Sequence, residues 1–511
     1  MDQHRKVRVR FAPSPTGGLH LGGVRTALFN YLFARQHGGS FILRIEDTDR
    51  TRFVPGAEAY IQECLAWCGI SPDESPDHGG EYGPYRQSER KANYRQYAEQ
   101  LVADGYAYYA FDTADELDAQ RKQQPNFRYS HENRLQLRNS LSLPPEETRQ
   151  LLAAGSPHVI RIKMPVDETI HFDDMIRGSV SFDSSLIDDK VLLKADGMPT
   201  YHLAVVVDDH QMAISHIFRG EEWLPSAPVH ILLWEYLGWR DAMPRWAHLP
   251  LILKPDGNGK LSKRDGDRLG FPVYAMNWQD PQTGAVTEGF REMGFLPEAF
   301  VNLLATLGWN DGSEQELFAL NELVDKFSLE RVSKAGAKFD FEKAKWFNHE
   351  WIKRSNDDSL LPQLTALLAD HGVSDADGQY LAAVLALVKD RLTFLSDFWT
   401  QAAFFFKRPD SYDLAAVQPR WNADKTAFFT DMIGKLESFA PWQSAELESC
   451  YKQAIQASGM KMGELMLPFR IMLVGGKFGP HVFDIAAQLG REETVARVKI
   501  GLEAFTTPAA L

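Results

Sequence analysis

The first 50 residues carry the pattern that most restricts how this chain can fold. VRVRFA at 7–12 alternates apolar with basic residues, and SFILRIE at 40–46 alternates again, so both segments predict strands. Between them, PSPTGG predicts a turn, and a helix fits 22–36 before Gly38 and Gly39 end it. Strand, glycine-rich turn, helix and strand in this order predict a βαβ unit of an α/β fold with a parallel sheet. Its phosphate-facing end would be the turn and the start of the helix.

The pattern changes along the rest of the chain, which we divide into five parts. Residues 1–85 and 198–251 show the strand and helix pattern and are interpreted as two halves of one α/β domain. Residues 86–197 combine charged helical stretches with a strand-rich part, which predicts an insertion between the halves. Residues 252–344 begin with an apolar strand that runs into a loop rich in Gly, Asp and Lys, and 345–511 show helical periodicity.

Composition excludes several classes of protein. The three cysteines, Cys64, Cys68 and Cys450, are too few for a disulfide framework or a four-cysteine zinc site. The N-terminal segment lacks the apolar stretch of a secretory signal, and apolar runs such as LAAVLALV at 381–388 are too short to cross a bilayer. We therefore expect a cytoplasmic protein without membrane contact. The net charge of −14 argues against coating nucleic acid over the whole surface and leaves a local basic groove open.

Two loops contain residue types that bind phosphate. In GGLHLGGVR at 17–25, glycines allow the backbone to approach phosphate oxygens, and the helix start supplies N–H donors. This loop is not a P-loop, because GK[ST] is missing, and although His20 could donate to a phosphate, a single histidine is more often structural. KLSKR at 260–264 places three cations within five residues on a glycine-flanked loop, which suits a mobile clamp on a polyphosphate. By itself, KLSKR is more often a solvated basic loop.

Taken together, PSPTGGLHLGG and KLSKR resemble the two signature motifs of class I aminoacyl-tRNA synthetases. A further ordered set of motifs resembles the bacterial glutamyl-tRNA synthetases: RFAPSPTG (10–17), LRIEDTD (43–49), GPYRQSER (83–90), DGMPTYHLA (196–204), RGEEWL (219–224), ERVSKAGAKFDFEKAKWFN (330–348) and, more loosely, KMGELMLPFRIMLVGG (461–476). The resemblance covers nearly the whole chain. It implies a Rossmann-type parallel-sheet catalytic domain, an α/β insertion that binds the acceptor stem, a stem-contact domain at 252–344 and an all-helical anticodon-binding region.

The resemblance also implies an activity. Such an enzyme uses ATP and Mg²⁺ to attach L-glutamate to tRNA-Glu through a glutamyl-adenylate, and it is usually a monomer. In this family, arginines at the positions of Arg10 and Arg219 hold the side-chain carboxylate of glutamate, for which a bidentate guanidinium is well suited. The carboxylate at the position of Glu46 meets the substrate ammonium. The other positions at the amino-acid pocket are Ala12, Ser14, Tyr201, Val205 and Trp223.

The resemblance also implies which residues of this chain contact the nucleotide and the tRNA. Residues implied to bind ATP are Pro13, Ser14, Thr16, Gly17, His20, Gly22, Gly23, Lys260, Leu261, Ser262, Lys263 and Arg264. Among them, His20, Lys260 and Lys263 are implied to act in catalysis by stabilising charge on the triphosphate. Arg331, Lys334 and Lys338 are implied to contact the inner stem of the tRNA, although any single cation there is more often part of a solvated face.

Three positions depart from the family pattern. Relatives often have Asn at the position of Val205, where it contacts the substrate α-carboxylate, and valine cannot donate a hydrogen bond. Gly23 stands where the class has its final histidine, which leaves His20 as the histidine of that motif. Ala110 and Asp112 replace the two cysteines of a zinc motif present in many relatives, so we predict no zinc.

Three other functions share some of these sequence features. Enzymes that attach glutamate to a queuosine of tRNA-Asp resemble the catalytic half and lack a helical C-terminal region, which this chain has. Glutaminyl-tRNA synthetases append β-barrels, and this C-terminal part shows helical periodicity. A silent paralogue that binds tRNA without chemistry would be expected to lose phosphate-binding residues such as His20 and Lys263, which are intact. Residues 271–289 exceed the usual loop after KLSKR and receive no function from the sequence.

Overall fold

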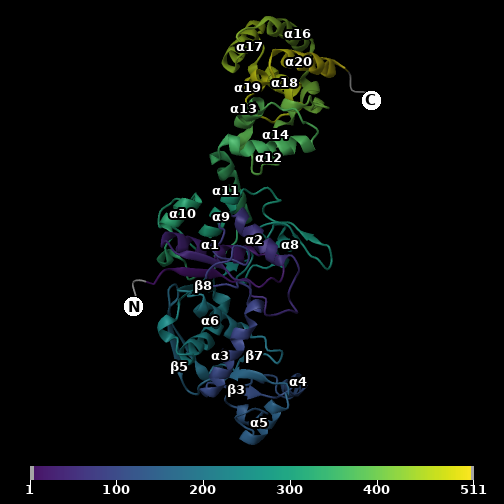
Figure 1. The fold of residues 1–511 in the computed structure, drawn as a ribbon. Helices are drawn as coiled ribbons and strands as arrows, with labels where there is room; N and C mark the ends of the chain where they lie inside the picture. The colour runs from purple at the N-terminus through teal and green to yellow at the C-terminus, as the bar shows by residue number, and fades with distance from the viewer. Residues whose placement is uncertain (1–4, 508–511) are drawn as a thin grey trace. The chain divides into compact units, whose positions relative to one another are not determined.

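The computed structural model describes residues 5–507, which form two compact units (Figure 1). The first unit comprises the chain up to Met293 together with Pro297–Phe341, and the second comprises Gly294–Leu296 and Glu342–Leu511. Among the residues that the structure describes, no helix is both long and apolar enough to cross a membrane.

The N-terminal part forms a βαβ unit. Its elements are β1 (Arg8–Phe11), α1 (Leu21–Gln36), β2 (Ser40–Leu43) and the following helix α2 (Ala57–Trp67). β1 and β2 pair in parallel, with Arg8 opposite Ser40 and Phe11 opposite Leu43. α1 begins where the side chain of His20 accepts a hydrogen bond from the N–H of Gly22. The predicted turn between β1 and α1 therefore lies at the carboxyl end of β1.

Four strands form the larger sheet of the first unit: β5 (Thr169–Asp174), β6 (Gly178–Asp183), β8 (His216–Gly220) and β9 (Arg245–Leu249). Their order is β6-β5-β9-β8, in which β8, β9 and β5 are parallel and β6 is antiparallel. The N–H of Ser215 donates to the carbonyl of Arg8 over 2.9 Å, so β8 starts beside β1. The four-stranded sheet is thus mixed and not purely parallel, because two strands from the predicted insertion at 86–197, β5 and β6, extend it. The helices α6 (Tyr201–Gln211) and α7 (Ala227–Tyr236) contribute to the core around this sheet.

The remainder of the inserted segment forms a separate antiparallel sheet in the order β3-β4-β7. Its elements are α3 (Lys91–Ala103), β3 (Ala107–Ala110), α4 (Ala114–Gln123), α5 (Pro145–Ala153), β4 (Val159–Ile162) and β7 (Val191–Leu193). In Figure 1 these elements gather at one end of the first unit, away from α1. The insertion therefore has two parts, one with its own sheet and one built into the sheet of the α/β domain.

The rest of the first unit contains short elements: β10 (Ile252–Leu253), α8 (Lys263–Leu269), β11 (Trp278–Gln279), β12 (Val286–Thr287), α9 (Pro297–Thr306), α10 (Leu320–Lys326) and β13 (Ala337–Lys338). β10 pairs in parallel with β13, and β11 and β12 form an antiparallel hairpin inside 271–289. α8 begins within the KLSKR motif, because Ser262 and Asp265 form a capping box at its N-terminus. The motif is therefore partly helical, whereas the sequence predicted a loop.

The second unit contains helices and no strand between Glu342 and Thr507. These helices are α11 (Phe341–Arg354), α12 (Asp357–Asp370), α13 (Gly378–Val388), α14 (Asp397–Phe406), α15 (Leu414–Val417), α16 (Ala423–Ser438), α17 (Ser444–Ser458), α18 (Met462–Val474), α19 (Val482–Leu489) and α20 (Arg491–Thr506). Aromatic side chains fill part of its core, where the buried ring of Tyr451 stacks on Phe469 at 4.7 Å between centroids. This helical region agrees with the predicted fold class.

Candidate active site

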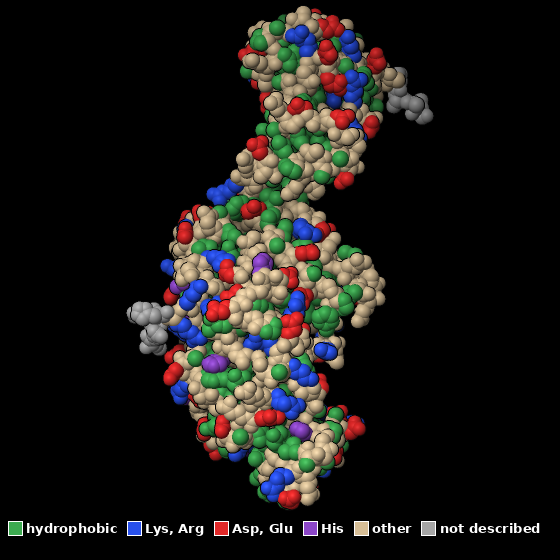
Figure 2. Space-filling model, in the orientation of Figure 1, with side chains coloured by type: hydrophobic (Ala, Val, Ile, Leu, Met, Phe, Trp, Pro, Cys, Tyr) green, Lys and Arg blue, Asp and Glu red, His purple; other side chains and the backbone are tan. Residues whose placement is uncertain are grey.

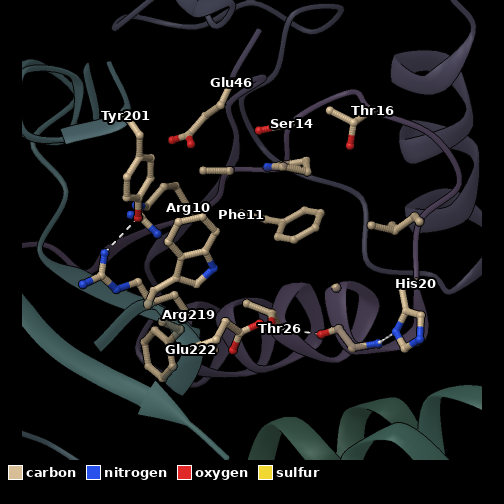
Figure 3. Close-up of a pocket in the computed structure, with 18 of the residues that line it drawn as sticks. Arg10, Phe11, Ser14, Thr16, His20, Thr26, Glu46, Tyr201, Arg219 and Glu222 are labelled. Carbon is tan, nitrogen blue, oxygen red and sulfur yellow. Dashed lines mark hydrogen bonds between the residues drawn. The ribbon is translucent and has the colours of Figure 1, made fainter. Parts of the chain in front are cut away.

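A cavity of about 760 Å³ opens beside the carboxyl end of β1 and the start of α1 (Figure 3). In α/β folds this edge of the sheet is where ligands bind. Figure 3 shows Arg10, Arg219 and Tyr201 toward one side of the cavity and His20 toward the other. The cavity therefore brings together residues that lie more than 200 positions apart in the sequence.

Most of the predicted site residues line this cavity. They are Arg10, Ala12, Pro13, Ser14, Thr16, His20, Gly22, Gly23, Glu46, Tyr201, Arg219, Trp223, Lys260 and Leu261. Gly17, Val205, Ser262, Lys263 and Arg264 do not line it. Val205 is 2% exposed and packs in the hydrophobic core, one turn of α6 after Tyr201, which does line the cavity. Ser262, Lys263 and Arg264 are exposed, since they form the cap and the first residues of α8.

A chain of buried charges extends from the cavity into the core, and two of its members, Arg10 and Glu46, line the cavity. Arg10 binds Asp209 through Nε at 3.0 Å and Nη2 at 3.2 Å, and Arg44 binds Asp209 at 2.7 Å and Glu46 at 3.0 Å. Burial acts to raise the pKa of Asp209, but the charges of Arg10 and Arg44 outweigh it and lower that pKa. Burial raises the pKa of Glu46, against the effect of the two arginines. Four charged side chains thereby hold one another at fixed positions.

Arg219 is buried without a carboxylate partner. Its Nε donates to Nε2 of His248 at 3.0 Å and its Nη1 donates to the hydroxyl of Tyr201 at 2.9 Å, while Nη2 has no hydrogen bond to any residue that the structure describes. None of the ion pairs among residues 5–507 includes this guanidinium, and burial lowers its pKa. A buried cation of this kind is costly unless an anion joins it. The side chain therefore has an unused donor ready for a carboxylate.

Two further residues hold Arg219 in place. Nδ1 of His248 lies 2.6 Å from a carboxylate oxygen of Asp174, and both side chains are fully buried. Since Nε2 of His248 accepts from Arg219, the proton of the neutral ring must lie on Nδ1 and be donated to Asp174. Burial lowers the pKa of His248, which agrees with a neutral ring. Asp174 belongs to β5, so a residue of the predicted insertion supports the cavity.

The ring of His20 has one nitrogen free. Its Nδ1 accepts from the N–H of Gly22 at 3.1 Å, so the neutral ring carries its proton on Nε2. This Nε2 is buried without a partner in the described part of the chain. Burial, helped by the charge of Lys260, lowers the pKa of His20 to about 4, which keeps the ring neutral at pH 7. His20 therefore offers a neutral N–H donor to the cavity.

The glycines that follow His20 differ from their predicted use. The N–H of Gly22 donates to the His20 ring, and the N–H of Gly23 donates to the His20 carbonyl at 2.8 Å. The sequence had suggested these amides as phosphate donors. Because the helix cap uses both of them, the ring of His20 is the group at this helix start that has an unused donor.

The two lysines that the family resemblance implies in catalysis lie in different settings. Lys260 lines the cavity and forms an ion pair with Glu222 at 2.5 Å. Lys263 is the first residue of α8, and its charge helps lower the pKa of Asp280, after hydrogen bonds from the backbone of Thr283 and Gln282. Both ammonium groups therefore stand near a carboxylate, and only Lys260 lies at the cavity.

The predicted tRNA contacts lie outside the cavity. Arg331 and Lys338 are exposed, and Nζ of Lys334 donates to the carbonyl of Arg177 at 3.4 Å. Figure 2 shows Lys and Arg side chains interspersed with Asp and Glu on the face drawn. No single-signed patch covers that face of the described chain, in keeping with the net charge of −14.

Ala110 and Asp112, which replace the cysteines of the relatives' zinc motif, have other roles in the structure. The carboxylate of Asp112 accepts hydrogen bonds from the hydroxyl of Tyr129 and the N–H of Arg138, both at 2.9 Å, and Ala110 is buried. Within residues 5–507, no group of three or more His, Cys, Asp and Glu side chains is arranged to hold a metal ion. The residues present therefore do not fit a zinc site.

Sequence reasoning missed four residues that shape the cavity: Arg44, Asp174, Asp209 and His248. Arg44 and Asp209 stand inside the motifs LRIEDTD and VVVDDH, so charged residues within otherwise apolar segments were a usable signal. For Asp174 and His248, strand pairing over more than 70 residues brings them together, and local patterns do not contain that information.

Family models define the class of protein. Residues 6–346 match the catalytic domain of class I tRNA synthetases (E and Q), and residues 358–502 match an anticodon binding domain. The mixed α/β sheet, the cavity at its edge and the helical second unit are thus those of a class I tRNA synthetase.

Relatives narrow the family further. Glutamate–tRNA ligase from Porphyromonas gingivalis is 54% identical over 501 residues, which cover 98% of this chain and 99% of that protein. The glutamate–tRNA ligase from Flavobacterium johnsoniae is also 54% identical, over 98% of this chain and 100% of that protein. A crystal structure of a glutamate tRNA ligase from Elizabethkingia meningosepticum, in complex with its amino acid, matches with a TM-score of 0.94 and 48% identity over 98% of this chain and 100% of that chain. The chain belongs to the glutamate–tRNA ligase family.

Proposed function

We propose that the protein, as a cytoplasmic monomer, attaches L-glutamate to tRNA-Glu at the expense of ATP. One observation carries the proposal: a single cavity contains a buried guanidinium without a carboxylate, a buried carboxylate, and a neutral histidine N–H beside a lysine. These groups complement the two carboxylates and the ammonium of glutamate and the phosphates of ATP.

Glutamate binds on the side of the cavity that contains the arginines. Nη2 of Arg219 takes the side-chain carboxylate, and Arg10, whose Nε and Nη2 are occupied by Asp209, contributes through Nη1. The carboxylate of Glu46 accepts a hydrogen bond from the ammonium group of the substrate. Because Val205 does not line the cavity and valine cannot donate a hydrogen bond, the α-carboxylate receives none from it and stays available for reaction.

The same geometry selects against glutamine. A neutral amide would leave the charge of Arg219 buried and uncompensated, whereas a carboxylate neutralises it. The Asp174–His248 pair prevents the guanidinium from turning away toward another partner, since it holds Nε. Selection between the two amino acids therefore follows from charge and not from size.

In the first chemical step, an oxygen of the glutamate α-carboxylate attacks the α-phosphorus of ATP in line. The new P–O bond gives glutamyl-adenylate, and the bond to the β-phosphate oxygen breaks, so that pyrophosphate leaves with the electron pair. Nε2–H of His20 donates to a phosphate oxygen, and Lys260 exchanges Glu222 for the phosphates. Lys263, at the start of α8, neutralises charge on the leaving pyrophosphate. The Mg²⁺ that accompanies ATP is bound chiefly by the phosphate oxygens of the substrate.

In the second step, the 2′-hydroxyl oxygen of the terminal adenosine attacks the carbonyl carbon of the adenylate and forms the ester bond. The bond from that carbon to the phosphate oxygen breaks, and AMP leaves with the electron pair while a phosphate oxygen takes up the hydroxyl proton. We assign the acceptor end to the insertion at 86–197 and the inner stem to the region of Arg331, Lys334 and Lys338. The helices of 345–511 would read the anticodon through side chains on unstacked bases.

Glutamate-dependent ATP–pyrophosphate exchange tests this proposal, measured without tRNA, with tRNA-Glu and with tRNA-Gln. Exchange that requires tRNA-Glu supports the proposal and indicates an enzyme that discriminates between the two tRNAs. Exchange with both tRNAs keeps the chemistry and gives a non-discriminating enzyme. The absence of exchange and of aminoacylation from folded protein would refute the proposal in favour of a silent tRNA-binding paralogue.

A further inference from the structure

Residues 271–289, here called the bridging segment, connect the two signature motifs physically. The segment follows α8 directly and contains the hairpin of β11 and β12. Its residues 281–286 are exposed, while Val273 and Trp278 are 2% and 8% exposed. The segment thus has a buried base and a solvent-exposed tip, and the base is the part that contacts the motifs.

The base packs against the first signature motif. The N–H of Leu21, the first residue of α1, donates to the carbonyl of Val273 at 2.8 Å, and His20 and Tyr274 form an antiparallel bridge. A Cβ built on Gly18 would lie 2.9 Å from Cγ of Trp278 and 3.1 Å from the Tyr274 ring. Only a glycine permits so close an approach without displacement of a neighbour. The loop that carries His20 is therefore in close contact with the bridging segment.

The same base packs against the second signature motif. Gly266 lies in α8, and a Cβ built there would lie 2.7 Å from the carbonyl oxygen of Phe271 and 2.7 Å from Cγ1 of Val273. Val273 therefore touches the helix that begins at Lys263 and also accepts the first hydrogen bond of α1. Val273 thus links the start of α1, at the end of the first motif, to α8, the helix that begins within the second motif.

The base is itself held by the α/β domain. The hydroxyl of Tyr60, on α2, hydrogen-bonds the carbonyl and the N–H of Met276, and its ring contacts Trp278 edge-on at 5.1 Å between centroids. The N–H of Phe290 donates to the carbonyl of Tyr274 at 3.0 Å, which closes the segment on itself. The contacts are backbone hydrogen bonds and tight packing, so the base is a rigid support.

We infer that the bridging segment sets the position of the His20 loop relative to α8, and that Val273, Tyr274 and Trp278 are positioning residues for ATP. This inference rests on the proposed function, because it assigns ATP to the cavity. Trp278 acts through Gly18 on the loop that carries His20, and Val273 acts on both motifs. When groups must contact the same transition state, a small displacement of one of them lowers the reaction rate strongly. We therefore expect changes in the bridging segment to affect the reaction rate more than the stability of the fold.

A double-mutant cycle between Gly18 and Trp278 tests the inference. Trp278→Ala is expected to raise the KM for ATP by about tenfold and to lower kcat, while the KM for glutamate changes by less than about twofold. Trp278→Phe should restore most of the ATP affinity, because it retains an aromatic ring on Gly18. Val286→Ala, at the tip of the same segment, is the matched control and should behave like wild type.

Gly18→Ala supplies the decisive comparison. In the wild-type background its Cβ meets Cγ and Cβ of Trp278 at 2.9 and 3.0 Å and the Tyr274 ring at 3.1 Å, so the KM for ATP should rise by about tenfold or more. Trp278→Ala removes the ring and keeps Cβ, so in that background the same substitution should cost at least about threefold less than in the wild-type background. An equal cost in both backgrounds would overturn the inference, as would equal effects of Trp278→Ala on ATP and glutamate.

Direct ATP binding, measured by calorimetry on the same full-length variants, separates this inference from the proposed function. If the wild-type protein made no glutamyl-tRNA, the proposed function would fail. The ATP affinities of the variants would still show whether Gly18 and Trp278 are coupled in ATP binding. Thermal unfolding of each variant identifies any that fail to fold. If Trp278→Ala does not fold, Trp278→Phe replaces it in the cycle with Gly18→Ala.

Discussion

Replacement of Arg219 by methionine tests whether the cavity recognises glutamate by charge. Methionine has a similar length and no charge, so the change removes the donor at Nη2 with little change in volume. When bound glutamate loses this partner, its buried carboxylate keeps only the contact with Arg10, whose charge is shared with Asp209, and breaking a buried ion pair costs about 3–5 kcal/mol. At about 1.36 kcal/mol per factor of ten, the lower value predicts a loss of about 150-fold in kcat/KM for glutamate.

The assay is ATP–pyrophosphate exchange in the presence of tRNA-Glu, with glutamate and ATP each varied in turn. We expect kcat/KM for ATP, measured at saturating glutamate, to change by less than about threefold, because Arg219 lies on the side of the cavity opposite His20. Arg219→Lys should lie between wild type and methionine, since lysine keeps the charge and loses the planar pair of donors. Equal losses for both substrates would refute the assignment of Arg219 to glutamate.

Stability offers a second readout of the same reasoning. Arg44 is the matched control, because it is equally buried but binds Asp209 and Glu46. Arg44→Met leaves Glu46 without its ion pair and Asp209 with Arg10 alone, and it should lower the free energy of unfolding by about 3–5 kcal/mol. Arg219→Met removes a cation that has no anionic partner in the free protein, so its cost should be much smaller. Equal destabilisation by the two substitutions would show that Arg219 is also paired in the free protein.

Three other predictions address the lysine, the buried histidines and the metal. Lys263→Ala should lower turnover in pyrophosphate exchange while glutamate affinity, measured by direct binding, changes by less than about twofold; wild-type turnover would contradict the role of this lysine. Burial lowers the pKa values of His20, His202 and His216 to about 4, so the unfolded chain binds protons that the folded protein does not. Stability should therefore be complete above about pH 6.5 and fall as pH decreases toward 4, by about 2 kcal/mol per histidine at pH 5, as measured by urea denaturation; a flat profile between pH 7 and 5 would disprove this. Treatment with a zinc chelator, followed by excess Mg²⁺, should leave aminoacylation unchanged, because Asp112 uses its carboxylate in hydrogen bonds, and stoichiometric zinc in purified protein would overturn that view.

Local patterns predicted the elements that depend on near neighbours. The strands at 7–12 and 40–46 and the helix at 22–36 are present at Arg8–Phe11, Ser40–Leu43 and Leu21–Gln36. Alternation and glycine stops act over a few residues, so a single sequence contains this information. The start of α8 was also predictable, because Ser262 and Asp265 have the spacing of a capping box.

Long-range pairing was not predictable in the same way. Arg10 meets Asp209 across 199 positions, which makes one of the two predicted glutamate arginines less available than the other. Motif positions alone had treated Arg10 and Arg219 alike. The location of Val205 in the core illustrates the same limit, since a position in a motif does not determine whether its side chain reaches the cavity or is covered by neighbouring core residues.

The parallel pairing of β5 with β9 has a consequence for engineering the insertion. Asp174, which ends β5, fixes His248, and His248 fixes Arg219, so part of the insertion belongs structurally to the amino-acid pocket. A chimaera that exchanged all of 86–197 would replace this support and is expected to lose amino-acid selectivity along with its original tRNA contacts. Exchange limited to the segment between α3 and β5, which includes the antiparallel pair of β3 and β4, would keep the Asp174–His248–Arg219 support and would test the proposed role of the insertion at the acceptor end. The borders of a transplantable module are therefore set by the order of strands in the sheet, and not by the ends of the inserted sequence.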